Sequence, residues 1–379
     1  MKYFLVISLL LFSTSCIKKH DVSFTGAVTG VKNGVFIVSN TDDSTVYGEN
    51  IKDGKFSITN RPLRYIGYYL IHITNNDSTK TLPPFEVYLE PGAYHVEADN
   101  NKLYKYPKII SPSDIQAQLS AYYTLYDKLY DEKFELSKKL NEELQTKGSS
   151  LSTEAHNALN NRAIQADVDF NNLPFLALSE YAKNSPQSDV TAHLMAKQNY
   201  EADPVGFYKL FKTFSKASQN SDDGKELGNK LGKLAKLVNG AKAPAIYGKT
   251  LDGKSFDQST IKSKVILIDF WRASNEISRR NHAAMIDFLQ TTKGTKKFDI
   301  VSVSIDTKVD WWVTAINEDH TTWTQVTDLK GDVSPNAENW GITKIPTYYL
   351  LNDKWEIIDR DFNIDRLDFE VNDYLNHHH

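Results

Sequence analysis

The spacing of apolar residues changes along this chain of 379 residues, and the change constrains its fold more than any other feature. Between residues 22 and 110, short apolar runs alternate with turn signals such as Asn33-Gly34 and Asp53-Gly54, a pattern typical of strands. Between 113 and 240, apolar residues recur at every third or fourth position, as in helices. Because domains usually contain about 100–200 residues, the chain is predicted to be multidomain.

The segment 22–112 is predicted to be an antiparallel β-sandwich or small barrel. Its apolar runs are separated by turn signals roughly every 8–12 residues, which is typical of such folds. The stretch Asp53-Gly54-Lys55-Phe56, followed by Leu89-Glu90-Pro91-Gly92, resembles a small β domain of unknown function. That domain commonly stands at the N-terminus of envelope lipoproteins, ahead of a thioredoxin-like domain.

The segment 113–240 is predicted to be helical. Ser113 and Asp114 supply capping groups for a first helix, in which Leu119, Tyr122 and Leu129 lie on one face. Further helices are expected at 154–170, 173–183, 190–197, 204–215 and 224–238.

The segment 241–376 alternates strands and helices. The continuous apolar run Val265-Ile266-Leu267-Ile268 is typical of a central strand buried on both faces. A helix is expected at 276–292 and a second buried strand at 298–305. Two more strands at 347–351 and 356–359 and a final helix at 366–375 complete the pattern. The order β-α-β followed by β-β-α is that of thioredoxin, so an α/β fold is predicted.

This third segment resembles a thioredoxin-like domain of the TlpA/ResA type, within the wider AhpC/TSA-related group. The resemblance implies that Pro346 is a cis-proline that faces the active site. It also implies that Asp269 matches the buried carboxylate that serves the resolving cysteine in thioredoxins; with no cysteine to serve here, its expected role is structural or vestigial. The stretches that carry it are Ala243-Pro244 with 251–256 (LDGKSF), 265–271 (VILIDFW), 302–306 (SVSID) and 340–347 (WGITKIPT).

Active members of that family carry a Trp-Cys-x-x-Cys motif after the first central strand. Here Asn275 stands at the position of the nucleophilic cysteine and Ser278 at that of the resolving one, while Ser274 replaces the tryptophan. Thiol–disulfide exchange needs a thiolate that attacks sulfur, and neither an amide nor a serine hydroxyl supplies one. Peroxidase chemistry also needs a cysteine. No catalytic residue is therefore predicted for the chemistry of this family.

The chain contains one cysteine, Cys16. A single thiol excludes an intramolecular disulfide, a CxxC pair and any site built from several thiolates. No metal and no cofactor are expected, because no ligand spacing is seen for His72, His95, His156, His193 and His320. A net charge of −4 is too balanced to suggest nucleic acid.

Residues 1–15 have the pattern of a signal peptide, with Lys2, an apolar run and then small residues. Cys16 directly afterwards resembles the lipobox of bacterial lipoproteins, although Ser13 replaces the usual leucine. The resemblance implies that lipid on Cys16 anchors the chain to a membrane, with 16–21 as a linker. A signal peptide with a chance cysteine is the alternative. Without an aspartate after Cys16 or an acidic cluster, the periplasmic face of the outer membrane is favoured over the cell surface.

The resemblance also implies a peptide-binding groove formed by Trp271, Asn275, Ile345, Pro346 and Thr347, in which the residue before the proline pairs its backbone with an extended peptide. The chain is therefore expected to be a lipid-anchored, redox-inactive thioredoxin-like protein that binds an envelope protein or peptide as a scaffold. The alternative is a thiol-disulfide oxidoreductase that works with a partner's thiol.

Three further hypotheses concern the helix after the groove and the C-terminal tail. Ser278 and His282 lie one turn apart, so a hydrolytic pair is geometrically conceivable. No carboxylate is identifiable from the sequence to orient the imidazole, and His282 is expected to be solvated. Arg272, Arg279 and Arg280 form either a basic patch that binds a carboxylate or phosphate, or a solvated helix end. His377, His378 and His379 are a tag remnant or a native tail.

Overall fold

A computed structural model describes residues 20–76, 83–292 and 297–378. The predicted signal peptide, Cys16 and most of the predicted linker lie outside the described residues. The chain forms two compact units. The first extends to Gln198 and includes Thr213–Gly224, and the second comprises Asn199–Lys212 together with the residues from Lys225 onwards.

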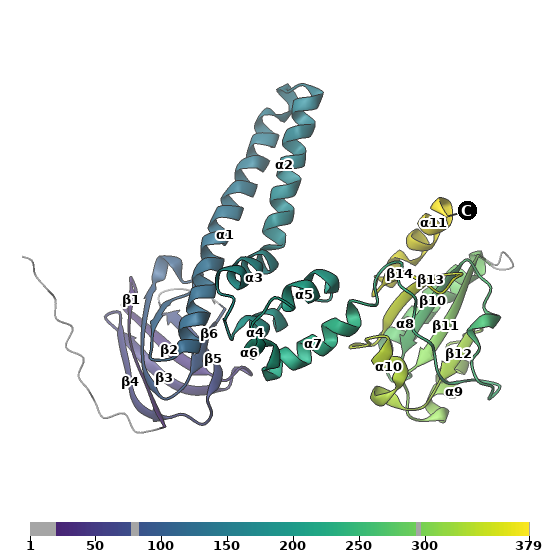
Figure 1. The fold of residues 1–379 in the computed structure, drawn as a ribbon, viewed down its shortest axis with the longest axis horizontal. Coiled ribbons are helices and arrows are strands. Elements are labelled where there is room, and N and C mark those ends of the chain that lie inside the picture. The colour runs from purple at the N-terminus through teal and green to yellow at the C-terminus, as the bar shows by residue number, and fades with distance from the viewer. Residues whose placement is uncertain (1–19, 77–82, 293–296, 379) are drawn as a thin grey trace, which may run out of the picture. The chain divides into compact units, whose positions relative to one another are not determined.

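The strands of the first unit form one curled sheet (Figure 1). Its order is β6-β5-β2-β3-β4-β1-β7-β8, and neighbouring strands are antiparallel except β1 and β7, which pair in parallel. Along their described lengths, β3 and β4 pair only through Lys52 and Lys55 beside their turn. The sheet therefore opens into two four-stranded halves. The strands are β1 (Asp21–Thr29), β2 (Asn33–Ser39), β3 (Thr45–Lys52), β4 (Lys55–Pro62), β5 (Gly67–Asn75), β6 (Phe85–Leu89), β7 (Gly92–Asp99) and β8 (Lys108–Ile110).

The turn between the two halves explains how they are joined. Asp53 and Gly54 have φ angles of +47° and +73°, as the tight turns that connect right-twisted strands require. Alternate residues of the strands point into one core, where the rings of Phe36 and Phe56 stack at 4.1 Å. A Cβ at Gly26 would lie 2.3 Å from the ring of Phe56, so glycine makes room for this ring.

The helices of the first unit begin with α1 (Asp114–Lys147), which packs against β6, β8, α2 and α3. Its cap is the predicted one, because the Ser113 side chain accepts a hydrogen bond from the Gln116 backbone N–H. The Gln116 side chain in turn accepts from the Tyr88 N–H and so ties α1 to the sheet. The other helices of this unit are α2 (Thr153–Asn171), α3 (Leu173–Asn184), α4 (Thr191–Ala196) and α6 (Lys216–Asn220).

A partly buried ionic cluster, centred on the buried Glu86, joins these helices to β6. His193 on α4 lies with Nε2 3.0 Å from Oε1 of Glu86 and Nδ1 2.7 Å from Oδ2 of Asp223, and Lys197 also bonds Glu86. Burial favours the neutral form of Glu86, but His193 and Lys197 outweigh it and lower the pKa of this carboxyl group. The ring of Tyr68 stacks on His193 at 3.4 Å.

The second unit has a six-stranded sheet of order β14-β13-β10-β11-β12-β9. Strands β10, β11 and β12 are parallel, whereas β13 and β14 are antiparallel to their neighbours. With the helices between them, this is a thioredoxin-like fold. The elements are α5 (Pro204–Phe211), α7 (Asp222–Leu234, whose first residues belong to the first unit), β9 (Lys249–Thr250), β10 (Val265–Trp271), α8 (Glu276–Thr291), β11 (Phe298–Ser304), α9 (Val309–Glu318), β12 (Thr324–Thr327), α10 (Pro335–Asn339), β13 (Thr347–Asn352), β14 (Ile357–Arg360) and α11 (Leu367–His377).

All seven residues of β10 are buried, as predicted for a central strand. Val265 and Leu267 pack with Met285 of α8 and Val371 of α11, while Ile266 and Ile268 belong to the core on the opposite face. Because successive strand residues alternate between faces, Asp269 and Trp271 lie on the α8 side. The carboxyl ends of β10, β11 and β12 meet at one edge of the sheet, termed the carboxyl edge below.

Candidate functional site

The loop after β10 leads into α8 at the carboxyl edge, and Asn275 caps this helix. Its side-chain oxygen accepts a hydrogen bond of 2.8 Å from the Ser278 backbone N–H. Its amide nitrogen donates at 3.2 Å to the carbonyl of Ile345, the residue before Pro346. The Ile345–Pro346 peptide bond is cis, in agreement with the resemblance. Asn275 therefore joins the start of α8 to the proline loop through hydrogen bonds that a thiol would not make in this form.

Replacing Asn275 with alanine is expected to lower the free energy of unfolding of the second unit by about 1 kcal/mol, the usual cost of losing an N-cap side chain. Urea unfolding followed by tryptophan emission measures the change. The exposed neighbour Ser274 provides a matched control, because Ser274→Ala should change the stability by less than about 0.5 kcal/mol. Equal effects of the two substitutions would contradict the capping role.

Ser278 is fully buried, and its hydroxyl oxygen has no hydrogen-bond partner among the described residues. A substrate from solution cannot reach it in this arrangement. Trp271 and Thr347 are also buried, whereas Asn275, Ile345 and Pro346 are partly exposed. The structure thus brings the five predicted groove residues to one edge, with two of them beneath the surface.

His282 is 1% exposed, so the expectation that it is solvated is wrong. Its Nδ1 lies 2.7 Å from Oδ2 of Asp319, and its Nε2 lies 3.4 Å from Oδ2 of Asp269. Burial alone would lower the pKa of His282, but the two carboxylates outweigh burial and raise it. The ring is held between these two carboxylates, and the Ser278 hydroxyl has no hydrogen-bond partner among the described residues, so the imidazole is not placed as a base for Ser278. The hydrolytic hypothesis therefore has neither an accessible nucleophile nor a base.

Asp319 was missed by sequence reasoning, although it orients the imidazole. It follows α9, a helix that the sequence analysis did not predict, and lies 37 residues from His282 along the chain. Burial favours the neutral form of Asp319, but Arg279 and His282 outweigh it and lower its pKa. The amphipathic order Val309-Asp310-Trp311-Trp312-Val313 is the signal that could have indicated α9.

Two of the three arginines in the predicted basic patch are neutralised within the unit. Arg272 pairs with Asp332 and donates to the Ile305 carbonyl. Arg279 pairs with Asp319 and with Glu318. Arg272 and Arg279 therefore do not form a free basic patch; both side chains are partly exposed and brace the loops and α9 against the start of α8.

The carboxyl edge carries large apolar side chains in contact with solvent. They lie in the first turn of α8, in the first turn of α9 and in the loops after β12, and their exposed fractions range from 37% to 83%. The ammonium group of Lys308 lies 4.4 Å from the ring centre of Trp311. We term these residues the apolar rim: Ile277, Val309, Trp311, Leu329 and Val333.

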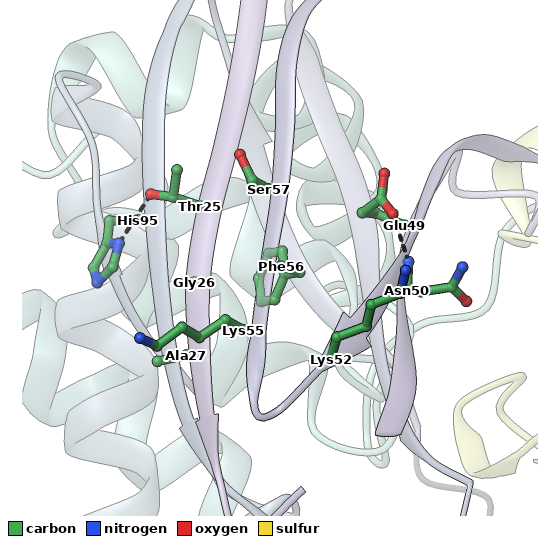
Figure 2. Close-up of a pocket in the computed structure, with 10 residues that line it drawn as sticks. All are labelled: Thr25, Gly26, Ala27, Glu49, Asn50, Lys52, Lys55, Phe56, Ser57 and His95. Carbon is green, nitrogen blue, oxygen red and sulfur yellow. Dashed lines mark hydrogen bonds between the residues drawn. The ribbon is translucent and has the colours of Figure 1, made fainter. Parts of the chain in front are cut away.

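The first unit has a shallow depression of about 610 Å³ across β1, β3, β4 and β7, where the sheet opens (Figure 2). Two hydrogen bonds connect its polar lining residues: His95 Nδ1 lies 3.0 Å from Thr25 Oγ1, and the Glu49 side chain accepts from the Asn50 backbone N–H at 3.0 Å. They do not converge on one point, as a built ligand site requires. The lining residues are Thr25, Gly26, Ala27, Glu49, Asn50, Lys52, Lys55, Phe56, Ser57 and His95.

Metal ligands and membrane-spanning helices are both absent from the described part of the chain. No group of three or more His, Cys, Asp or Glu side chains is arranged there to hold a metal ion. No helix among the described residues combines the length and the apolar character that crossing a membrane requires.

No protein-family model and no curated protein matches this chain. Among solved structures, it is 32% identical to the thioredoxin domain of a thiol-disulfide oxidoreductase from Bacteroides vulgatus, covering 37% of this chain and 99% of that one with a TM-score of 0.35. A thiol:disulfide interchange protein from a Bacteroides species is also 32% identical, with coverages of 38% and 97% and a TM-score of 0.35. A thioredoxin-like protein from Bacteroides caccae is 18% identical, with coverages of 57% and 83% and a TM-score of 0.44.

Proposed function

We propose that this chain is a redox-inactive thioredoxin-like protein that binds a segment of another envelope protein at its carboxyl edge. We also propose that lipid on Cys16 tethers it to the outer membrane, on the periplasmic face. The proposal that redox function is lost rests on positions 275 and 278, where active members of the family have cysteines. The Asn275 side chain forms hydrogen bonds within the unit, and Ser278 is fully buried.

The apolar rim supports a binding role. Large apolar side chains that gather on one exposed surface often mark a protein interaction site. Trp311 is half exposed and stands beside Val309 in the first turn of α9, and tryptophan is among the residues that contribute most to binding energy at interfaces. The rim shares the carboxyl edge with the partly exposed Asn275 and the proline loop, so these features belong to one edge of the sheet.

The alternative, an oxidoreductase that works with a partner's thiol, lacks a reaction partner on this chain. A mixed disulfide needs a sulfur on each side, and Cys16 is the one cysteine of the sequence. If Cys16 carries lipid, the mature chain has no free thiol. A partner's thiol would then meet the Asn275 amide and the apolar rim.

The test combines an assay of chemistry with an assay of binding on the full chain. In insulin reduction and dithiol oxidation, turnover should stay at background, and turnover above it would contradict the proposal. In a pull-down from envelope extracts, Trp311→Glu should reduce capture of a specific partner by about tenfold or more, as at a binding hot spot. Leu251→Glu is the matched control: Leu251 is equally exposed but follows β9, away from the carboxyl edge. Equal loss with both variants would contradict binding at the rim.

A further inference from the structure

Beneath the carboxyl edge, three side chains from three elements form a continuous ionic chain. Asp269 comes from β10, His282 from α8 and Asp319 from the turn after α9. The imidazole lies between the carboxylates, 3.4 Å from Asp269 at Nε2 and 2.7 Å from Asp319 at Nδ1. Asp269 and His282 are buried, and the Asp319 side chain is 12% exposed. Water therefore cannot screen a change in charge at this point.

Each structural element that packs against the three ionic side chains contributes charged or polar groups around them. On α8, Arg279 shares Asp319 with His282 and also pairs with Glu318. On β11, the Ser302 hydroxyl donates to Asp269 at 2.7 Å.

Two further elements complete the surroundings. On β13, Tyr348 lies near Asp269, and burial together with that carboxylate raises the pKa of its hydroxyl. The rings of Trp271 and Trp323 stand edge-on to the imidazole, with centroids 4.8 Å and 5.8 Å from it. Among the described residues, the imidazolium is thus the one cation paired with Asp269, whereas Asp319 has Arg279 as a second.

The two contact lengths indicate which proton the ring loses first. A neutral imidazole keeps one N–H. The contact of 2.7 Å between Nδ1 and Asp319 is shorter than the 3.4 Å between Nε2 and Asp269, which favours keeping the N–H at Nδ1. The Nε2 lone pair then faces the Asp269 carboxylate across 3.4 Å of dry interior. An attraction between α8 and β10 becomes a repulsion, and a buried carboxylate loses its counter-charge.

We propose that the Asp269–His282–Asp319 chain is a proton-operated latch that holds the first half of α8 on β10. With both ring nitrogens protonated the latch is closed, and with Nε2 deprotonated the first two turns of α8, together with the cap Asn275 and the rim residue Ile277, loosen. This inference goes beyond the proposed function, because it concerns the state of the edge and its test needs no binding partner.

The direction of the pH dependence follows from linkage. The pKa of His282 is raised in the folded chain, so its contribution is fully present below the ordinary value of about 6.5 and is lost as pH rises through the folded value. The pKa of Asp319 is lowered, so its contribution is present above about 3.8 and is lost as pH falls through the folded value. The latch is therefore closed between these limits.

The experiment follows ¹³C-histidine resonances of the full chain against pH and measures hydrogen-exchange protection of α8, with α2 in the other unit as reference. His282→Asn identifies the His282 resonance, and His320→Asn is the matched control because this neighbour has φ +55°, which asparagine tolerates. We expect a His282 midpoint above 6.5. If the midpoint lies about one pH unit above 6.5, the hydrogen-exchange protection of α8 should fall about tenfold across the titration. Protection of α2 should not change.

Two substitutions keep the test decisive. In His282→Asn, α8 protection should no longer fall as pH rises, because the titrating ring is gone. In Asp269→Asn the fall should be clearly smaller than in the unaltered chain, because the repelling charge is gone and only the contact with Asp319 still raises the pKa of His282. If His282→Asn fails to fold, Asp269→Asn still decides the matter, because it retains the imidazole. A His282 midpoint at or below 6.5, or a pH-dependent loss of α8 protection that is undiminished in Asp269→Asn, would overturn the latch.

Discussion

Replacing His282 with alanine is expected to lower the free energy of unfolding of the second unit by about 3–5 kcal/mol at pH 7, the usual cost of removing one partner from a buried ion pair. In the alanine variant Asp269 is a buried carboxylate without a counter-charge. Among the described residues, it keeps the hydrogen bond from the Ser302 hydroxyl. Asp319 retains Arg279. Urea unfolding at pH 7, followed by circular dichroism, measures the loss without relying on the tryptophans beside the ring.

The double substitution Asp269→Asn/His282→Ala separates the charge from the lost packing. Because the asparagine removes the uncompensated charge, the double variant should be more stable than His282→Ala alone. His320 provides the control, because it takes no part in the ionic chain, and His320→Asn should change the stability by less than about 0.5 kcal/mol. Additive losses in the double variant would contradict the ionic explanation of the effect.

The elements that the sequence predicts well are those whose signal is local. The apolar run of β10 stands out because every residue of a central strand is buried, and the helices from α1 to α4 follow from their apolar spacing and from caps such as Ser113. The Asp53-Gly54 turn is local in the same sense. In each case a few neighbouring residues determine the backbone, and tertiary contacts agree with that preference.

The features that the sequence did not reveal depend on contacts between distant residues. The parallel pairing of β1 with β7 joins residues 22–29 to 92–99, whereas hairpin signals predict only antiparallel neighbours. Asp319 reaches His282 from a helix that the pattern had not indicated, so no carboxylate partner was predicted for the imidazole. The spacing of Ser278 and His282 was visible, but their burial depends on how α8 packs against β10.

Trp271 was predicted as a groove residue, although a tryptophan in a central strand is more often part of the core, and the structure places it in the core. It follows Asp269 by two residues, so strand alternation places both side chains on the face that α8 covers. The Trp312 side chain packs against it in a small cluster of its own. Trp271 therefore supports the carboxyl edge from below, and the exposed tryptophan at this edge is Trp311, which the family motif does not include.

Restoring both thiols, as Asn275→Cys/Ser278→Cys in a Cys16→Ser background, is expected to convert the chain from background turnover to measurable insulin reduction. The two positions are three residues apart at the start of α8, where the N-terminal end of a helix favours a thiolate over a thiol. Mild oxidation should lower the mass of the variant by that of two hydrogen atoms, because an intramolecular disulfide forms with the loss of both thiol hydrogens. Losing the Asn275 cap should reduce stability by about 1 kcal/mol, which the chain can tolerate.

The single variants show whether the gain comes from a pair of thiols. Asn275→Cys should react with alkylating reagents, because position 275 is partly exposed, whereas Ser278→Cys should be protected, because position 278 is fully buried. Neither should turn over insulin, since release of a mixed disulfide needs a second thiol on the same chain. If the double variant forms no disulfide, restoring the two thiols is not enough to restore redox chemistry. The backbone at the start of α8 would then hold positions 275 and 278 in a geometry that a disulfide cannot bridge.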